Sequence, residues 1–223
     1  MKDLQREART AGPQGAVPGS GSTSRASSAL LLRVALPFYG VLFAATLLWA
    51  WLAGDSLLYA SQEAARRGVD PLLDAGAGVL AGAIVVALSR ALTLRTRWGT
   101  DLARALGALV GRASLRNCVL LAAVSGVAEE ALFRGALQPR IGLVAASLLF
   151  GCVHFVPRRE FLPWTAFSIA AGFLLGGLFA ATGNLVAPTI AHALINAVNL
   201  RVLAVRFAPP EEDSTARGGG QPT

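Results

Sequence analysis

The sequence has only two cysteines among its 223 residues, and this scarcity excludes two kinds of site. Cys118 and Cys152 stand alone, without C-x-x-C spacing, so they form neither a disulfide framework nor a zinc cluster. We expect both to be small buried apolar side chains. Two hydrolase signatures are also missing from the sequence: the H-E-x-x-H zinc motif and the G-x-S-x-G serine element.

Charged residues are scarce as well. They make up 15% of the chain against 54% hydrophobic residues, and the mean hydropathy is +0.54. This composition is too apolar for an ordinary soluble domain and indicates a membrane protein with several spans. Bases outnumber acids, with 20 Lys and Arg against 13 Asp and Glu, and the arginines lie mainly between apolar runs. We interpret this excess as a signal of membrane orientation, and we expect no nucleic-acid partner.

Apolar segments near the roughly 20 residues that cross a bilayer recur along the chain. They cover about residues 30–53, 73–94, 117–138, 141–157, 162–182 and 184–205. The sequence therefore predicts an all-α, polytopic transmembrane helical bundle of about six spans. We divide it into a disordered tail at 1–28, two N-terminal transmembrane helices at 29–99, a membrane core at 100–207 and a disordered tail at 208–223.

Basic residues in the short loops predict the orientation of these spans. With six spans, most of them fall on one side: Lys2, Arg6, Arg9, Arg25, Arg95, Arg97, Arg104, Arg112, Arg116, Arg158 and Arg159. The other side receives Arg66, Arg67 and Arg140, so the positive-inside rule places both termini in the cytoplasm. Apolar residues at helical spacing in 100–112 predict a helix on the cytoplasmic membrane surface. We expect a bacterial inner membrane from the Ala/Arg/Gly-rich composition and the lack of a visible targeting sequence.

Three charged residues interrupt the third predicted span. They are Glu129, Glu130 and Arg134, and charges at this depth need partners or a polar cavity. Glu130 and Arg134 are four residues apart and share a helix face, whereas Glu129 points about 100° away. We therefore expect Glu130 and Arg134 to pair and to hold the helix in place. An unpaired Glu129 in a desolvated site would be suited to act as a general base.

The two histidines of the chain both lie in predicted spans. Phe150 and His154 share one face of the fourth span, and His192 and Asn196 share one face of the sixth. Since an unsatisfied imidazole is costly in a bilayer, we expect these residues to form one site with the glutamates, between the later helices. We also expect Pro157 to end the fourth span. Glycine pairs four residues apart, Gly78 with Gly82 and Gly172 with Gly176, indicate close helix packing.

This set of residues permits hydrolysis of a peptide bond. Glu129 could take a proton from a water that His154 positions, and the resulting hydroxide could attack a peptide carbonyl. His192 and Asn196 could then donate hydrogen bonds to the oxyanion. This glutamate mechanism requires no cofactor. Alternatively, Glu129, His154 and His192 could bind zinc, and the metal would activate the water. The residues leave both routes open.

The motifs resemble those of the CAAX prenyl protease type II and bacteriocin-processing (CPBP, or Abi) intramembrane endopeptidases. The family pattern E-E-x-x-x-R matches residues 129–134, F-x-x-x-H matches 150–154, and H-x-x-x-[N/D] matches 192–196. The resemblance covers roughly residues 100–205. It implies a helical membrane endopeptidase, often labelled a metalloprotease, that acts on membrane-associated or prenylated proteins or peptides. It also implies catalytic roles for Glu129, His154, His192 and Asn196, and supporting roles for Glu130, Arg134 and Phe150.

Two other classes of function compete with a protease. Buried Glu and His residues also build the proton relays of ion-coupled transporters, but no inverted repeat is evident, because the polar residues cluster in the second half of the chain. A non-catalytic scaffold or immunity protein could keep the same residues for stability. The sequence does not indicate an oligomeric state.

Overall fold

The computed structural model describes residues 22–209, with side chains from residue 32 onward, and this part of the chain is helical. The α-helices are α1 (Ser22–Ala53), α2 (Gln62–Arg67), α3 (Pro71–Arg95), α4 (Arg97–Val110), α5 (Leu115–Glu130), α6 (Gln138–Val153), α7 (Leu162–Thr182) and α8 (Val186–Arg206). A π-helix, η1 (Ala131–Leu137), joins α5 to α6, and a 3₁₀ turn, η2 (Arg159–Phe161), precedes α7. The predicted all-α bundle is confirmed.

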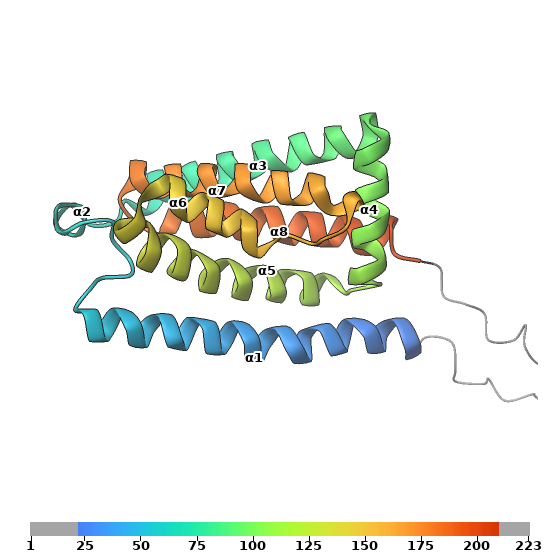
Figure 1. Ribbon diagram of the computed structural model, residues 1–223, viewed down its shortest axis with the longest axis horizontal. Helices are drawn as coiled ribbons and strands as arrows, with labels where there is room; N and C mark the ends of the chain where they lie inside the picture. The colour runs from blue at the N-terminus through green and yellow to red at the C-terminus, as the bar shows by residue number, and fades with distance from the viewer. Residues whose placement is uncertain (1–21, 210–223) are drawn as a thin grey trace, which may run out of the picture.

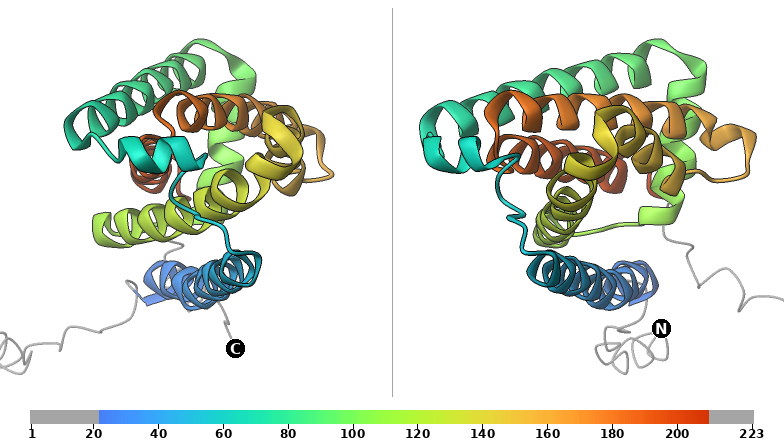
Figure 2. Two further views of the ribbon diagram at one scale, coloured as in Figure 1. Left: turned by 90° about the vertical axis from the view of Figure 1, so that its left-hand side faces the viewer. Right: turned by 60° about the vertical axis from the view of Figure 1, so that its left-hand side comes forward.

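The long helices lie side by side in one bundle, with α1 at one edge (Figure 1). α1 contacts mainly α5 and η1, whereas α8 contacts α3, α5 and α7 and lies at the centre (Figures 1 and 2). The start of α1 and the end of α8 lie at the same end of the bundle (Figure 1). Since α1 is already helical at Ser22, the first helix begins before the predicted boundary at residue 29. Residues 1–21 and 210–223, which hold most of the predicted tails, lie outside the described residues.

The structure contains five segments long and apolar enough to span a membrane, where the sequence predicted about six. The third and fourth predicted spans fall in one helical run, Leu115–Val153. This run reverses direction at Gly142, whose φ of 82° and ψ of 164° are accessible almost only to glycine, and α6 folds back along α7 (Figure 1). The helix beyond Gly142, residues 143–153, is only about 16 Å long at about 1.5 Å per residue, half of the roughly 30 Å hydrocarbon core.

The predicted surface helix is α4, which lies across the ends of the long helices (Figure 1). The N-cap Thr96 starts it, because the Thr96 side chain accepts a hydrogen bond from the Gly99 amide. α4 contacts α3, α7 and α8, so it closes one end of the bundle. This is the end at which α1 begins and α8 ends.

Glycines allow the closest helix contacts, as their spacing predicted. A Cβ at Gly78 would lie 2.5 Å from the Ala187 carbonyl of α8, and a Cβ at Gly172 would lie 2.8 Å from the Ser147 carbonyl of α6. Real Cβ atoms do not approach backbone oxygens so closely, so both contacts require glycine. The α3–α8 and α6–α7 contacts place the polar segments of α5, α6 and α8 around a common centre.

Candidate active site

The acidic residues lie where α5 changes into the π-helix η1. Glu129 and Glu130 are the last two residues of α5, and Arg134 lies within η1. π-helical turns are rare and are found frequently at functional sites. All three side chains are buried, with exposed fractions of 7% for Glu129, 0% for Glu130 and 1% for Arg134. Burying charged groups costs free energy unless they are paired, so the stability of this segment depends on the groups that these side chains contact.

Glu130 and Arg134 form the predicted ion pair. The Arg134 Nη1 lies 3.0 Å from Glu130 Oε1, and the Arg134 Nη2 donates to the Gly172 carbonyl of α7 at 3.1 Å. His192 Nδ1 lies 2.7 Å from the same Glu130 oxygen. Phe150 packs against the guanidinium, whose Cζ is 4.4 Å from the ring centroid. Through these contacts Glu130 joins α5, η1 and α8.

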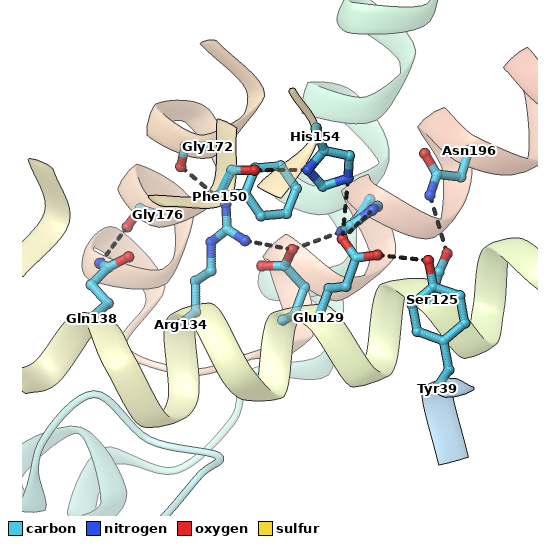
Figure 3. Close-up of polar contacts among 12 residues, drawn as sticks. Tyr39, Ser125, Glu129, Arg134, Gln138, Phe150, His154, Gly172, Gly176 and Asn196 are labelled. Carbon is cyan, nitrogen blue, oxygen red and sulfur yellow. Dashed lines mark hydrogen bonds and ion pairs between the residues drawn. The ribbon is translucent and has the colours of Figure 1, made fainter. Parts of the chain in front are cut away.

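Glu129 has different partners, as the helical spacing predicted. The Tyr39 hydroxyl of α1 donates to Glu129 Oε1 at 2.9 Å (Figure 3). The other oxygen, Oε2, is buried and has no hydrogen-bond partner. It faces two imidazole nitrogens, the Nε2 atoms of His154 at 3.8 Å and of His192 at 3.9 Å. Three groups capable of proton transfer or hydrogen bonding thus converge on one small space.

The hydrogen bond of His154 determines which of its ring nitrogens carries the proton and which faces Glu129. His154 Nδ1 is 2.7 Å from the Phe150 carbonyl (Figure 3), and because a carbonyl only accepts, this nitrogen carries the proton. The Nε2 of a neutral His154 is then free to accept a hydrogen bond from water.

His154 follows directly after α6, which ends at Val153. The prediction that Pro157 ends this helix was wrong, because the chain leaves the helix before reaching the proline.

Asn196 lies one helical turn beyond His192 on α8 and has a partner of its own. Its Nδ2 donates to the Ser125 hydroxyl of α5 at 3.2 Å (Figure 3). No hydrogen bond joins Asn196 to Glu129, His154 or His192 among the interactions found in residues 32–209. Its side chain nevertheless lines the same cavity as those three residues.

This cavity has a volume of about 940 Å³ and reaches from the candidate site to α4. At the site it is lined by Tyr39, Ser125, Glu129, His154, His192 and Asn196, and at its other end by Trp98 and Leu106 of α4. Glu130 and Arg134 do not line it. The cavity therefore separates the two adjacent glutamates: Glu129 faces the cavity, and Glu130 lies behind its wall.

The zinc alternative can be tested on the arrangement of the side chains. Two ligands that each lie about 2.0–2.2 Å from a tetrahedral zinc are roughly 3.3–3.6 Å apart. The Nε2 atoms of His154 and His192 lie 3.8 and 3.9 Å from Glu129 Oε2, which is wider. Within the described part of the chain, no group of three or more His, Cys, Asp or Glu side chains is placed to hold a metal ion. The residues as arranged do not fit zinc.

Sequence reasoning missed Tyr39, Ser125 and Gln138. Gln138 lies four residues after Arg134, and its Nε2 donates to the Gly176 carbonyl at 2.9 Å, which repeats the Arg134–Gly172 contact one turn further along (Figure 3). Polar groups inside apolar spans were the available signal for all three. The sequence predicts a site between the later helices, but the Tyr39 contact to Glu129 brings α1 into the site as well.

Comparison with known proteins agrees with these motifs. A family model described as Type II CAAX prenyl endopeptidase Rce1-like matches residues 111–198. The uncharacterized protein YpbD of Bacillus subtilis is 41% identical over 92 residues, which are 40% of this chain and 47% of YpbD. The match thus spans about half the length of that relative. No solved structure matches the chain. Residues 111–198, which hold all three motifs, are therefore similar to the Rce1-like type II CAAX prenyl endopeptidase family, the family that the motifs resemble.

Proposed function

We propose that this integral membrane protein is an intramembrane endopeptidase in which Glu129 activates a water molecule. One observation carries the proposal. Glu129 Oε2 is buried without a hydrogen-bond partner, faces the Nε2 atoms of His154 and His192, and lines a cavity of about 940 Å³. A buried carboxylate oxygen without a partner is costly, so its retention favours a role in binding or chemistry. The family match supports proteolysis as that chemistry.

The proposed reaction uses the two glutamates differently. Glu129 takes a proton from a water molecule. Glu130 instead holds Arg134, so Arg134 does not donate a hydrogen bond to that water. The hydroxide oxygen bonds to the peptide carbonyl carbon, and the carbonyl oxygen becomes an oxyanion. When the tetrahedral intermediate collapses, the carbon–nitrogen bond breaks, and the proton on Glu129 passes to the leaving amine. Acid and base roles thus fall to one carboxyl group.

His154, His192 and Asn196 supply hydrogen bonds in this scheme. His154 accepts from the water through Nε2, since its Nδ1 is bound to the Phe150 carbonyl. A protonated His192 donates to the oxyanion through Nε2, with Glu130 on its Nδ1 balancing the charge. The Asn196 amide, on the same wall of the cavity, is the second donor and exchanges its bond to Ser125 for one to the oxyanion.

The substrates we propose are membrane-associated or lipidated peptides and proteins. The cavity is lined mostly by apolar side chains from α3, α4, α7 and α8, which suit a substrate with an apolar segment or lipid. The family description names CAAX prenyl endopeptidases, so prenylated C-terminal peptides are the first substrates to test.

The test is cleavage of a quenched peptide library, with a farnesylated CAAX peptide included, by the full chain purified in detergent. We expect the wild type to cleave and the Glu129→Ala variant to lose at least about 100-fold in kcat, since a general base contributes about 10²–10⁴-fold. Glu160→Ala, which removes an exposed acid outside the cavity, is the matched control and should keep full activity.

Two further outcomes decide between the alternatives. A Glu129→Ala variant as active as the wild type would contradict the proposal. A chelator arm tests the metal: activity that survives chelation supports the glutamate mechanism, whereas activity that zinc restores after chelation would overturn it.

A further inference from the structure

We propose that Tyr39 is a positioning residue that fixes the orientation of the Glu129 carboxylate. This inference rests on the proposed function, and it adds a residue from α1, outside the region 111–198 that matches the family model. It starts from the one hydrogen bond that Glu129 makes with another side chain in residues 32–209. The Tyr39 hydroxyl donates to Oε1 at 2.9 Å (Figure 3).

A carboxylate needs such a contact because its terminal torsion is broad and nearly two-fold. The two oxygens of a free Glu129 would exchange places and tilt within the cavity. Neither histidine lies within hydrogen-bond distance of Glu129, because the Nε2 separations are 3.8 and 3.9 Å. Arg134 is bound to Glu130 and Gly172. Within the described chain, Tyr39 therefore supplies the contact that holds Oε1 away and leaves Oε2 facing both histidines.

The packing of α1 explains why Tyr39 reaches this position. Its buried residues, Thr46 and Ala50, lie seven and eleven positions after Tyr39, so all three share one helix face. α1 packs against α5 and η1, the elements that carry Glu129 and Arg134. The neighbouring Phe38 is 60% exposed on the outer side and meets the Tyr39 ring edge to face at 5.1 Å between centroids. Tyr39 therefore lies on the face that meets the site.

The kinetic test compares the two tyrosines of the chain. Tyr39→Phe keeps the ring and removes the hydroxyl, whereas Tyr59→Phe changes a loop residue that does not line the cavity. A hydrogen bond to a charged group corresponds to about 10- to 100-fold in rate. We expect Tyr39→Phe to lower kcat by that factor with KM unchanged, because Tyr39 orients the base and does not bind the peptide. We expect Tyr59→Phe to match the wild type.

A spectroscopic test does not depend on peptide cleavage. In a Tyr59→Phe background, Tyr39 is the single tyrosine, so biosynthetic incorporation of 3-fluorotyrosine labels it alone. We expect the ¹⁹F resonance to move when Glu129→Gln replaces the carboxylate by a neutral amide. The exposed Asp101→Asn change on α4 is the control and should leave the resonance in place.

Either result can overturn the inference. A wild-type kcat in Tyr39→Phe, or a ¹⁹F resonance that does not move when Glu129→Gln is introduced, would show that the contact does not position the base. If Tyr39→Phe fails to fold, the ¹⁹F comparison decides alone. A wild type that cleaves no peptide would contradict the proposed function while the ¹⁹F shift still tests the contact, so the two failures are distinguishable.

Discussion

At the scale of single residues, the adjacent Glu129 and Glu130 have different environments although they are neighbours in the chain. Glu130 has no exposed surface and contacts Arg134 and His192 through one oxygen, Oε1. Glu129 is next to it in the chain, yet it faces the cavity. The 100° rotation per residue of a helix produces this division. The two glutamates are therefore not interchangeable: Glu129 faces the cavity, and Glu130 contacts Arg134 and His192 behind the cavity wall.

The buried ion pair should govern stability, and the chain offers a matched control. Arg134–Glu130 and Arg104–Asp101 both have an N–O distance of 3.0 Å, but the first pair is 1% and 0% exposed and the second 68% and 64%. Arg134→Leu would leave Glu130 buried without its cation, which costs about 3–5 kcal/mol. Arg104→Leu should cost about 0–1 kcal/mol. Thermal unfolding in detergent measures both. Equal melting temperatures for the two variants would contradict this account.

At the scale of helices, two parallel contacts join η1 and the start of α6 to α7. Arg134 and Gln138, four residues apart, donate to the carbonyls of Gly172 and Gly176, which are also four apart. Both carbonyls belong to α7, and each accepts a hydrogen bond from a side chain of the neighbouring segment. The small-residue spacing of α7 thus serves hydrogen bonding as well as close packing.

Gly172→Ala should loosen this contact. A Cβ there would lie 2.8 Å from the Ser147 carbonyl and 3.1 Å from the Ser147 Cα, so α6 and α7 must separate. Overpacking of this kind costs about 1–3 kcal/mol, so we expect a lower melting temperature. We also expect reduced activity, because Arg134 loses its hydrogen bond to the Gly172 carbonyl. Gly177→Ala is the control, because a Cβ at Gly177 meets nothing within 4 Å. Equal effects of the two substitutions would rule out the close contact as the cause.

The sequence predicted the local part of the site better than the distant part. The Glu130–Arg134 pair followed from helical spacing alone, and that prediction is confirmed. The Tyr39–Glu129 contact joins residues 90 positions apart and depends on how α1 packs, which no local pattern encodes. The predicted spans 117–138 and 141–157 imply a reversal between them, but its position at Gly142 was missed, because glycine is compatible with a membrane helix as well as with a reversal.

At the scale of the whole molecule, the arginines are distributed unevenly between the two ends of the bundle. The helix ends and loops at the end closed by α4 hold eight arginines by their helix bounds: Arg95, Arg97, Arg104, Arg112, Arg116, Arg158, Arg159 and Arg206. The segments at the opposite end hold Arg66, Arg67 and Arg140, together with Asp55, Glu63 and Asp70. By the positive-inside rule, we propose that the α4 end faces the cytoplasm.

Labelling of introduced cysteines tests this orientation. In a Cys118→Ala, Cys152→Ala background, Glu63→Cys and Arg159→Cys each place one exposed thiol at opposite ends of the bundle. We expect a membrane-impermeant maleimide added to intact cells to label the first variant and to leave the second unlabelled until the cells are lysed. The reverse pattern would invert the proposed topology.

The short helix α6 has a consequence for the supply of water. It ends at Val153, and the chain then runs without helix to η2, past the middle of the bundle (Figure 1). Backbone without regular hydrogen bonds is tolerated at membrane depth only beside protein or water. His154, at the start of this stretch, lines the cavity that extends to α4. We therefore infer that the short helix leaves an inlet through which water, the second reactant of the proposed hydrolysis, reaches Glu129 from outside the bilayer.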